Sequence, residues 1–314
     1  MNQSSFRLRA ADGVELFVRR FDPDAARPVR ATVQLLHGMG EHGARYARVA
    51  QALSAEGFAV FAADCRGHGE TAASAAELGF FAERDGWQAL VSDVQALAAH
   101  VSELLPGRPR VLLGHSMGSF LALDCLTQFG DTLAAAVLSG SNGGTGATAL
   151  AFRAVAEVER RRLGARGQSP VLQKLVFGRV NTAFEPAATA FDWLSRDPAE
   201  VAKYVADPLC GFVLTAGGFA DLAGALARVG RGSVLARIPR DLPIYLFGGE
   251  LDPVGGRAGI GRLGAELRAA GVERVVERVY PGGRHEMLNE TNRDEVTREL
   301  CEWLASVVAT APEN

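Results

Sequence analysis

The 314-residue sequence lacks the features that mark several classes of protein. Its formal net charge is only −3, so no overall field attracts nucleic acid or an anionic membrane. The first ten residues, MNQSSFRLRA, contain no apolar segment of the kind found in a signal peptide. No apolar run approaches the roughly 20 residues that a transmembrane helix requires. We therefore expect a soluble, cytoplasmic protein that does not bind nucleic acid.

Metal-binding and disulfide patterns are equally scarce. The cysteines at positions 65, 125, 210 and 301 are scattered without a C-x-x-C pair, which suits a reducing compartment. His285-Glu286 begins like the H-E-x-x-H zinc motif, but position 289 is asparagine instead of the second histidine. The sequence therefore predicts no metal site.

What the sequence does contain is an alternation of strand and helix patterns. Residues 6–21 alternate polar and apolar side chains around Asp12-Gly13, which predicts an antiparallel hairpin. Apolar runs then predict strands at 32–36, 58–63, 110–113, 134–139, 243–247 and 274–279. Amphipathic patterns predict helices at 45–56, 87–104, 117–129, 260–270 and 295–308. Such alternation indicates an α/β fold with a mostly parallel central sheet covered on both faces.

The alternation stops between residues 141 and 220. A glycine-rich stretch at 142–146 leads into helical segments, one of them expected at 149–163, without a clear strand. This segment is too long for an ordinary connection between two strands. We predict a core formed by residues 1–140 and 221–314, with residues 141–220 inserted as a helical cap.

A glycine-rich loop after the first predicted parallel strand permits two interpretations. Gly38, Gly40 and Gly43 form G-x-G-x-x-G between a strand and a helix, and Asp64 closes the next strand about twenty residues later. This is the spacing of a dinucleotide-binding fingerprint. The same loop could instead stabilise an oxyanion, because backbone amides beside glycine are open to any negative charge.

A second glycine motif predicts a nucleophile. Residues 114–118, GHSMG, form G-x-S-x-G between a strand and a helix. The flanking glycines, Gly114 and Gly118, allow the sharp turn that exposes the Ser116 hydroxyl at the edge of an α/β-hydrolase sheet. A helix N-cap is the simpler role for such a serine, but the strand–turn–helix context favours the nucleophile.

A serine nucleophile requires a base, and an acid that orients the base. His285 is the only histidine that follows Ser116, and it lies just after the last predicted strand. Asp252 follows the strand at 243–247 and is the first choice for the acid, with Glu250 as the second. Asp241 precedes that strand, at the wrong edge of the sheet. The chain order Ser, acid, His is that of α/β-hydrolases.

These motifs together resemble a known family. The segments concerned are HGMGEH (37–42), DCRGHG (64–69), GHSMG (114–118), FDWLSRD (191–197), DPLC (207–210), GGELDPV (248–254) and GGRHE (282–286). They are similar to those of monoacylglycerol lipases and bacterial lysophospholipases, which are serine hydrolases of the α/β-hydrolase fold. The resemblance implies an oxyanion hole formed by the backbone N–H groups of Met39 and Met117. Ser119 departs from the family pattern, which often has glycine there.

The resemblance implies a serine esterase that cleaves a small lipid or ester through an acyl-enzyme, without a cofactor. A monoacylglycerol or a lysophospholipid is the expected substrate, and brief contact with lipid aggregates is compatible with the cap. A short-chain carboxylesterase, a thioesterase or a perhydrolase could use the same residues, and a non-catalytic binding protein of this fold is a remote alternative. A dinucleotide enzyme is disfavoured, because it has no use for Ser116, Asp252 and His285. The sequence leaves the oligomeric state open.

Apolar residues in and beside the predicted cap have two possible roles. They could line an acyl channel or simply pack the cap onto the core. The residues concerned are Phe152, Val155, Phe177, Phe184, Phe191, Leu214 and Phe219.

Overall fold

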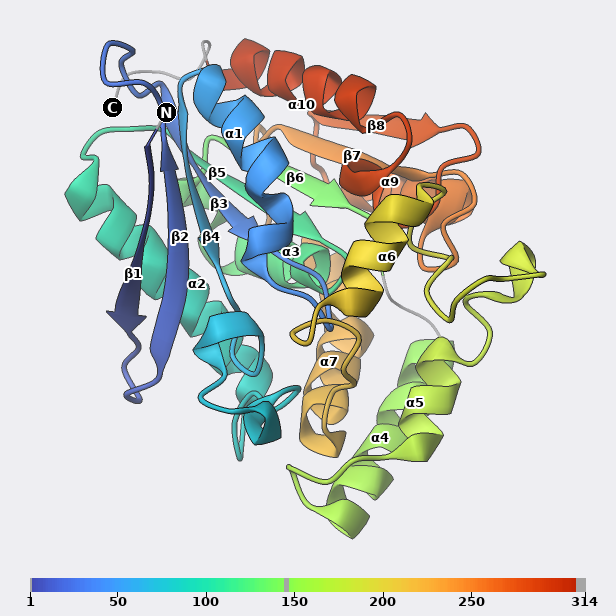
Figure 1. Cartoon of the computed structure of the whole chain (residues 1–314). Helices are drawn as coiled ribbons and strands as arrows, with labels where there is room; N and C mark the ends of the chain where they lie inside the picture. The colour runs from blue at the N-terminus through green and yellow to red at the C-terminus, as the bar shows by residue number, and fades with distance from the viewer. Residues whose placement is uncertain (1, 144–146, 309–314) are drawn as a thin grey trace.

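The computed structural model describes residues 2–143 and 147–308 and is centred on an eight-stranded sheet (Figure 1). The strand order is β1-β2-β4-β3-β5-β6-β7-β8. The strands are β1 (Asn2–Arg9), β2 (Glu15–Asp22), β3 (Ala31–Leu36), β4 (Phe58–Ala63), β5 (Arg110–His115), β6 (Ala135–Ser139), β7 (Ile244–Gly249) and β8 (Val275–Tyr280). Strand β2 pairs antiparallel with β1 and β4, and the other pairs are parallel. The expected fold class is confirmed.

The N-terminal hairpin forms because its turn satisfies the backbone locally. Gly13 has φ +92°, a left-handed conformation that suits glycine, and the Val14 N–H donates to Asp12 Oδ1 at 3.3 Å. Strand β1 pairs with β2 along its whole length, from Asn2 opposite Asp22 to Arg9 opposite Glu15. The hairpin therefore extends the sheet beyond β4.

Helices cover both faces of the parallel strands. Helices α1 (Ala47–Ala55) and α10 (Arg293–Val308) pack together on one face (Figure 1). Helices α2 (Gly86–Leu104), α3 (Met117–Phe129) and α9 (Gly256–Ala269) cover the other face. Every residue of β3, β4, β6 and β7 is buried, as expected for parallel strands with helices on both sides.

The predicted element boundaries are close to those observed. The strand at 58–63 and the helix at 117–129 have the expected ends. The helix expected at 45–56 is shorter, because a 3₁₀ turn at Gly43–Tyr46 precedes α1. This turn brings Arg45 and Tyr46 close to the loop after β3, which becomes important at the site.

Between β6 and β7 the described residues form no strand, a 3₁₀ turn (Thr182–Phe184) and five α-helices. The helices are α4 (Ala147–Leu163), α5 (Pro170–Phe177), α6 (Pro198–Ala206), α7 (Ala216–Val229) and α8 (Gly232–Leu235). Helix α7 contacts α4 and also the core helices α2 and α3, and residue 220 lies inside it. The cap boundary at residue 220 stays a prediction. Residues 144–146 of the glycine-rich stretch lie outside the described residues.

The loops that follow β3, β5, β7 and β8 emerge at one edge of the sheet, because these strands run in the same direction. They carry Gly38, Ser116, Asp252 and His285 respectively. The carboxyl edge of a parallel sheet is where sites of α/β proteins form. The fold therefore gathers residues that are far apart in the sequence.

Candidate active site

Ser116 lies at the sharp turn between β5 and α3. Its backbone has φ 51° and ψ −119°, and it is one of two non-glycine residues with positive φ in the described chain. A Cβ atom at Gly114 would lie 2.2 Å from the Gly118 carbonyl oxygen, and one at Gly118 would lie 2.2 Å from that of Leu36. Both glycines are therefore needed for the close approach of helix and strand. The strained serine is typical of a nucleophile elbow.

His285 and Asp252 form a buried pair. His285 Nδ1 lies 2.9 Å from Asp252 Oδ1, and the two residues are 2 % and 6 % exposed. The Val254 N–H also donates to Asp252 Oδ1, at 2.8 Å. Burial raises the pKa of Asp252, but the neighbouring His285 outweighs it, so the pKa lies below its ordinary value. Asp252 is therefore an anion that holds the imidazole in one orientation.

The imidazole of His285 contacts two other rings. Its centroid lies 4.9 Å from the Trp193 ring and 4.7 Å from the His115 ring. Burial lowers the pKa of His285, but Asp252 and then the carboxylates of Glu286 and Glu41 raise it above its ordinary value. His285 is thus a buried histidine beside carboxylates that favour its protonated form.

His115 itself stays neutral. Burial, followed by the charge of His285, lowers the pKa of His115 to about 4. Its Nδ1 lies 3.2 Å from Ser139 Oγ. His115 thus packs against the imidazole of His285 without competing for its proton. The serine at position 119 has a local role, because its hydroxyl donates to the Ser116 carbonyl at 2.6 Å.

The loop after β3 is held by two of its own side chains. The Cys65 N–H donates to His37 Nε2 at 2.9 Å, and His37 Nδ1 contacts the Gly38 carbonyl at 2.7 Å. Burial lowers the pKa of His37, which agrees with a neutral ring that accepts at one nitrogen and donates at the other. The Gly38 N–H donates to Glu41 Oε1 at 2.6 Å. The backbone of this loop is therefore fixed before any substrate binds.

A cavity of about 370 Å³ opens onto these residues. Gly38, Met39, Ser116, Met117 and His285 all line it. The rest of its wall is largely apolar and comes from α3, α4, α5, α7 and the Trp193–Leu194 segment. A larger cavity of about 610 Å³ lies between α2, α4 and α7, but it is lined mainly by charged residues and by none of the predicted site residues. The smaller cavity is the candidate site.

Few of the apolar residues singled out in the sequence reach this cavity. Phe152 of α4 and Phe177 of α5 line it. The other five do not: Val155, Phe184, Phe191, Leu214 and Phe219. Leu214 and Phe219 are completely buried in the main hydrophobic cluster, so their role is to pack the chain together.

The second choice for the acid, Glu250, and the acidic residue of the apparent fingerprint, Asp64, both have other partners. Glu250 pairs with Arg257 at 2.9 Å and accepts from the Gly282 N–H at 3.1 Å. Asp64 is completely buried and accepts from the Gly43 N–H at 2.8 Å and from Arg19 at 2.6 Å. The acidic residue of the apparent dinucleotide fingerprint thus fixes the end of the loop by accepting from its backbone at Gly43.

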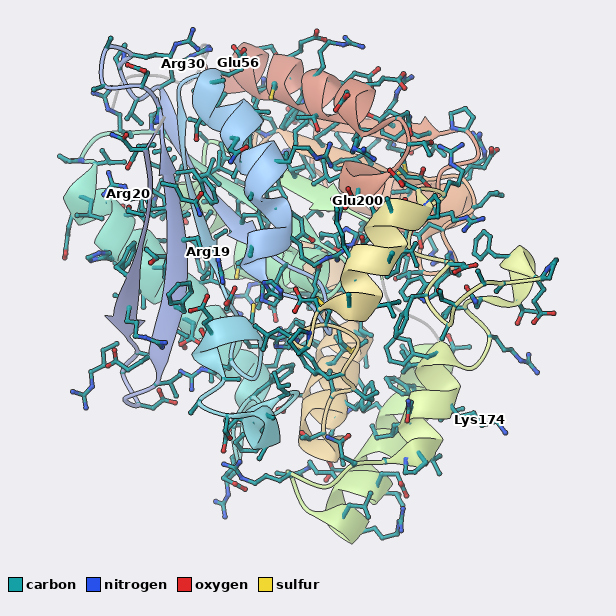
Figure 2. The ribbon with its side chains drawn as sticks, in the orientation of Figure 1. Arg19, Arg20, Arg30, Glu56, Lys174 and Glu200 are labelled. Atoms are coloured by element: carbon teal, nitrogen blue, oxygen red, sulfur yellow. The ribbon has the colours of Figure 1, made fainter. Side chains whose placement is uncertain are left out.

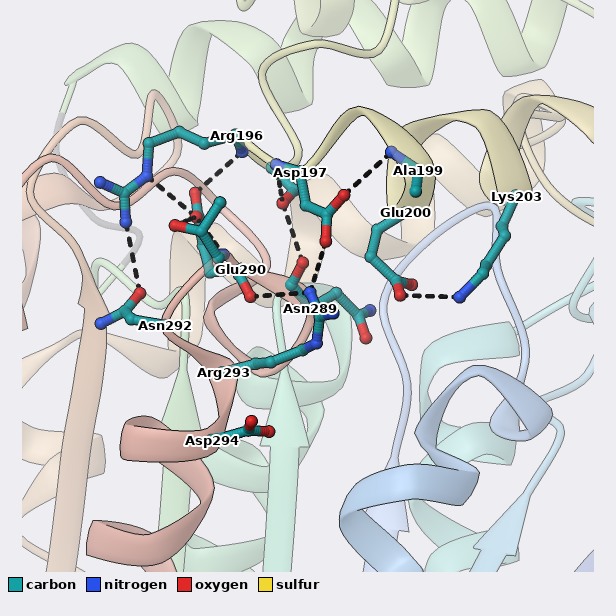
Figure 3. A network of polar contacts seen from close by, with 12 residues as sticks. Arg196, Asp197, Ala199, Glu200, Lys203, Asn289, Glu290, Asn292, Arg293 and Asp294 are labelled. Carbon is teal, nitrogen blue, oxygen red and sulfur yellow. Dashed lines mark hydrogen bonds and ion pairs between the residues drawn. The ribbon is translucent and has the colours of Figure 1, made fainter.

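A network of polar contacts fastens the cap to the loop that carries His285 (Figure 3). Glu290, which is completely buried, accepts from Arg196 Nε at 2.9 Å and from the Arg196 N–H at 3.0 Å. Glu290 also accepts from the Arg284 N–H at 3.0 Å. The His285 N–H donates to the Trp193 carbonyl at 3.3 Å. The cap segment at 192–197 and the histidine loop therefore form one unit.

Three potential metal ligands meet in the structure, although one of them, His42, lies far from the other two in the sequence. Donor atoms of His42, Asp207 and Cys210 lie within 4.8 Å of one another. His42 Nε2 is already 2.9 Å from Asp207 Oδ2, and burial raises the pKa of the Cys210 thiol, which disfavours the thiolate that a metal binds. An ion could enter only by breaking the contact between His42 and Asp207. The absence of a metal site stays a prediction.

Comparison with known proteins places the chain in a family. The family model of serine aminopeptidases, S33, matches residues 27–292. The chain belongs to this family. A monoacylglycerol lipase of Mycolicibacterium smegmatis is 30 % identical over 309 residues, which cover 97 % of this chain and 98 % of that protein. The human monoglyceride lipase is 28 % identical over 313 residues, which cover 96 % of this chain and 90 % of that protein.

The structural comparison agrees with the sequence comparison. A thermostable carboxyl esterase of Bacillus coagulans, solved with glycerol, has a TM-score of 0.89 and 27 % identity and covers 98 % of this chain and 99 % of its own. The expected resemblance is confirmed: the protein is an α/β-hydrolase that resembles monoacylglycerol lipases and hydrolyses carboxylic esters. Within residues 2–143 and 147–308, we find no helix with the length and apolar character needed to cross a bilayer.

Sequence reasoning missed several residues around the predicted site. Trp193 against the imidazole, and the buried carboxylates of Glu286 and Glu290, have no local signal that marks their contacts. Glu41 and Arg45 do carry one, because their spacing of four residues is that of an ion pair on a helical turn. Their common partner across the site could be found only in the folded structure.

Proposed function

We propose that Ser116 is the nucleophile, His285 the general base and Asp252 the residue that orients the base. The observation that carries this proposal is the strained Ser116 facing the same cavity as the buried His285–Asp252 pair. With Nδ1 donating to Asp252, the lone pair of His285 lies on Nε2, where it can accept the serine proton. Ser116 Oγ then attacks the ester carbonyl and forms a tetrahedral intermediate.

The N–H groups of Met39 and Met117 stabilise the oxyanion of that intermediate in this proposal. Met117 is the first residue of α3, where backbone N–H groups have no acceptor within the helix. Met39 follows Gly38 in the loop fixed by Glu41. The intermediate collapses to an acyl-enzyme when His285 protonates the leaving alcohol, and water then releases the acid. Loss of one such donor typically slows a hydrolase by about 10²–10³.

We further propose a monoacylglycerol as the substrate. The apolar wall of the cavity suits a single acyl chain. Near His285 the wall carries Glu41 and Glu286, and Arg45 neutralises only one of these two charges. A phosphate would be repelled there, whereas a neutral glycerol would be accepted. Arg262 also lines the cavity but is exposed. The lipases to which the chain is similar support the same substrate class.

A panel of esters tests this proposal. The expected order of kcat/KM is monoacylglycerol first, then short p-nitrophenyl esters, then lysophosphatidylcholine, and a fluorophosphonate probe should label Ser116. We expect Ser116→Ala to lose about 10⁴-fold or more of the activity and all of the labelling. Full turnover by Ser116→Ala would exclude the proposed nucleophile. A clear preference for acetyl or butyryl esters would instead favour the short-chain esterase, the alternative supported by the carboxyl esterase with the same fold.

The cap helices α4 and α5 are proposed to touch the lipid aggregate from which the substrate is drawn. They expose five large apolar side chains, Leu150, Val155, Val158, Val171 and Leu175, each of them 36–61 % exposed. Lys174 extends from α5 away from the body of the protein (Figure 2). Such a surface, apolar with nearby positive charge, fits a lipid–water interface. Sedimentation with phospholipid vesicles tests the contact, and recovery of all protein in the supernatant would exclude it.

A further inference from the structure

A buried group of three charges lies between the loop after β3 and the loop that carries His285. Arg45 Nη1 and Nη2 donate to Glu286 Oε1 and Oε2 at 2.5 and 2.6 Å, and Nη1 also donates to Glu41 Oε2 at 2.6 Å. The side chains of Arg45, Glu41 and Glu286 are only 10 %, 3 % and 6 % exposed. We call these three residues the charge clamp.

The Glu41 end of the clamp holds the proposed oxyanion loop. Glu41 Oε1 accepts from the Gly38 N–H at 2.6 Å and from the Tyr46 hydroxyl at 2.7 Å. A Cβ atom added to Gly38 would lie 2.7 Å from that oxygen and 3.3 Å from Ser116 Cβ. The loop thus fits between the carboxylate and the serine without spare room. Movement of Glu41 would move Gly38, and with it the N–H group of Met39, the residue after Gly38.

The Glu286 end of the clamp holds the proposed base. Glu286 directly follows His285, and its N–H donates to the Leu194 carbonyl at 2.8 Å. Its Oε2 also accepts from Asn289 Nδ2 at 3.1 Å. The side chain and backbone of Glu286 are therefore both fixed, and they set the direction in which the chain passes through His285.

The cap closes over the clamp. The Arg45 guanidinium lies 4.7 Å from the centroid of the Tyr204 ring on α6, a cation–π distance. The Tyr204 hydroxyl donates to the Gly40 carbonyl at 2.8 Å, in the loop after β3. The Arg45 guanidinium thus contacts three parts of the molecule: the loop after β3, the loop that carries His285, and α6.

Stability alone gives little reason for this arrangement. Burial of an arginine and two carboxylates is costly, and apolar residues of similar volume often stabilise a protein as well or better. What an ion group does provide is a fixed geometry, since bidentate pairing sets both distance and direction. We propose that Arg45 and Glu286 are positioning residues, which fix the oxyanion loop relative to His285. This inference rests on the proposed triad.

The chemistry explains why these two loops need a fixed separation. In one step, negative charge develops on the substrate oxygen at the Met39 amide while a proton moves from Ser116 to His285. Donors and base must therefore both be in place around the same tetrahedral carbon, and a displacement of about 1 Å can cost about 10²-fold in rate. The clamp spans these two sides.

Glu286 also acts on His285 through its charge. The groups that face the imidazole are Asp252, Glu286, Glu41, His115 and Trp193. A negative charge at Glu286 favours the protonated imidazole, so its removal lowers the pKa of His285. The acid limb of the pH profile of kcat/KM should then move to lower pH. A residue that serves stability alone would not move this limb.

Glu286→Gln tests the inference, because it keeps the shape of the side chain and removes its charge. We expect kcat on a soluble ester to fall by about tenfold, with KM changed by less than about threefold. The affinity of a boronic acid, which mimics the tetrahedral intermediate, should fall by about the same factor as kcat/KM. Active-site titration with a fluorophosphonate corrects each value for the fraction of folded enzyme.

Asp93→Asn is the matched control. Asp93 forms an equally buried bidentate pair with Arg66, at 2.5 and 2.7 Å, which does not line the cavity. We expect it to lower stability without changing kcat, boronate affinity or the pH profile per folded enzyme. If Glu286→Gln and Asp93→Asn behave alike in these three measurements, the positioning role is excluded.

Arg45→Lys provides a second variant, since a lysine keeps the charge but cannot pair with both carboxylates in the same geometry. It should lower kcat and boronate affinity by about tenfold and leave the acid limb nearly in place. Wild-type values for both clamp variants, while Ser116→Ala is inactive, would overturn the clamp and leave the triad intact. Full activity of Ser116→Ala would overturn both.

Discussion

The two halves of the predicted cap are built in different ways. The half formed by residues 192–215, which include α6, is fastened to the core by polar contacts. Among them are Glu290 with Arg196 and the Tyr204 hydroxyl with the Gly40 carbonyl. The half formed by α4 and α5 presents apolar side chains, some of them into the cavity and others, such as Leu175, into solvent. Figure 1 shows this second half at the periphery of the molecule.

We infer from this difference that the two halves serve different purposes. The fastened half contacts the proposed base itself, because the Trp193 ring packs on the imidazole of His285 and the Trp193 carbonyl accepts from the His285 backbone N–H. A group that holds the base must not move during the reaction. The apolar half packs on α7 and lines the part of the cavity where the acyl chain is expected. We therefore expect substitutions in the first half to change catalysis and stability, and those in the second to change substrate binding.

The largest effect is expected at Glu290. Glu290→Ala removes a completely buried acceptor from the partly buried N–H groups of Arg284 and Arg196 and from Arg196 Nε. We expect the free energy of unfolding to fall by about 3–5 kcal/mol, and turnover to fall because the histidine loop loosens. Urea denaturation measures the first and ester hydrolysis the second. The control is Glu200→Ala on α6, which breaks a pair with the exposed Lys203 (Figure 3) and should cost less than about 1 kcal/mol. Equal losses would show that the cap is not fastened at Glu290.

A second expected effect concerns pH. His285 must be neutral to accept a proton, and its pKa lies above the ordinary 6.5, so kcat/KM should fall as the pH drops through a midpoint above 6.5. Burial is the largest influence and lowers this pKa. Trp193→Ala exposes the ring, so we expect the midpoint to move to higher pH, whereas Phe152→Ala in the other half should not move it. A pH profile in which both variants move the midpoint equally would contradict the division of the cap.

A smaller effect is expected for the acyl-binding half. Phe152→Ala removes an apolar wall of the cavity, and its loss should raise KM for a long-chain monoacylglycerol by about tenfold. The KM for p-nitrophenyl acetate should stay within about twofold, because an acetyl group buries little apolar surface. Steady-state kinetics with both substrates check this. An equal change for the two esters would mean that Phe152 acts through the packing of the cap.

The smallest effect is expected at the exposed surface. Leu175 is 58 % exposed on α5 and makes little contribution to folding. Leu175→Ser should leave stability and the hydrolysis of soluble esters unchanged and weaken binding to phospholipid vesicles by about fivefold. Vesicle sedimentation measures the binding, and thermal unfolding provides the control. Unchanged vesicle binding would remove α5 from the proposed lipid contact.

The fold was largely readable from local patterns. The strand at 58–63 and the helix at 117–129 were predicted with their ends, because a short apolar run or an apolar helical pattern next to glycine is a local signal. The cap was predicted only as a helical insertion. Helix α7 belongs to neither expected part alone, since it contacts both α4 and the core helices α2 and α3. A boundary of that kind depends on contacts between distant segments.

The candidate site also has parts that were predicted from local patterns and parts that depend on contacts between distant segments. Ser116, Asp252 and His285 were selected by residue type and by position after a strand, and the structure brings all three to one edge of the sheet, with His285 and Asp252 in contact. The loop after β3 was ambiguous in sequence, because glycine spacing serves any anion. The burial of Asp64 beneath the loop, in contact with Arg19, shows what the acidic residue of the apparent fingerprint does.

The sequence by itself determined the order of the strands along the chain, the glycines that shape the elbow and the residue types that could carry ester hydrolysis. These depend on backbone conformations and side-chain chemistry that are encoded within a few neighbouring residues. Only the tertiary structure decided that Glu286 meets Arg45 across 241 positions and that Trp193 covers His285. Such pairs form only when the chain folds and water is excluded, because the low dielectric of the interior strengthens the interaction between matched charges.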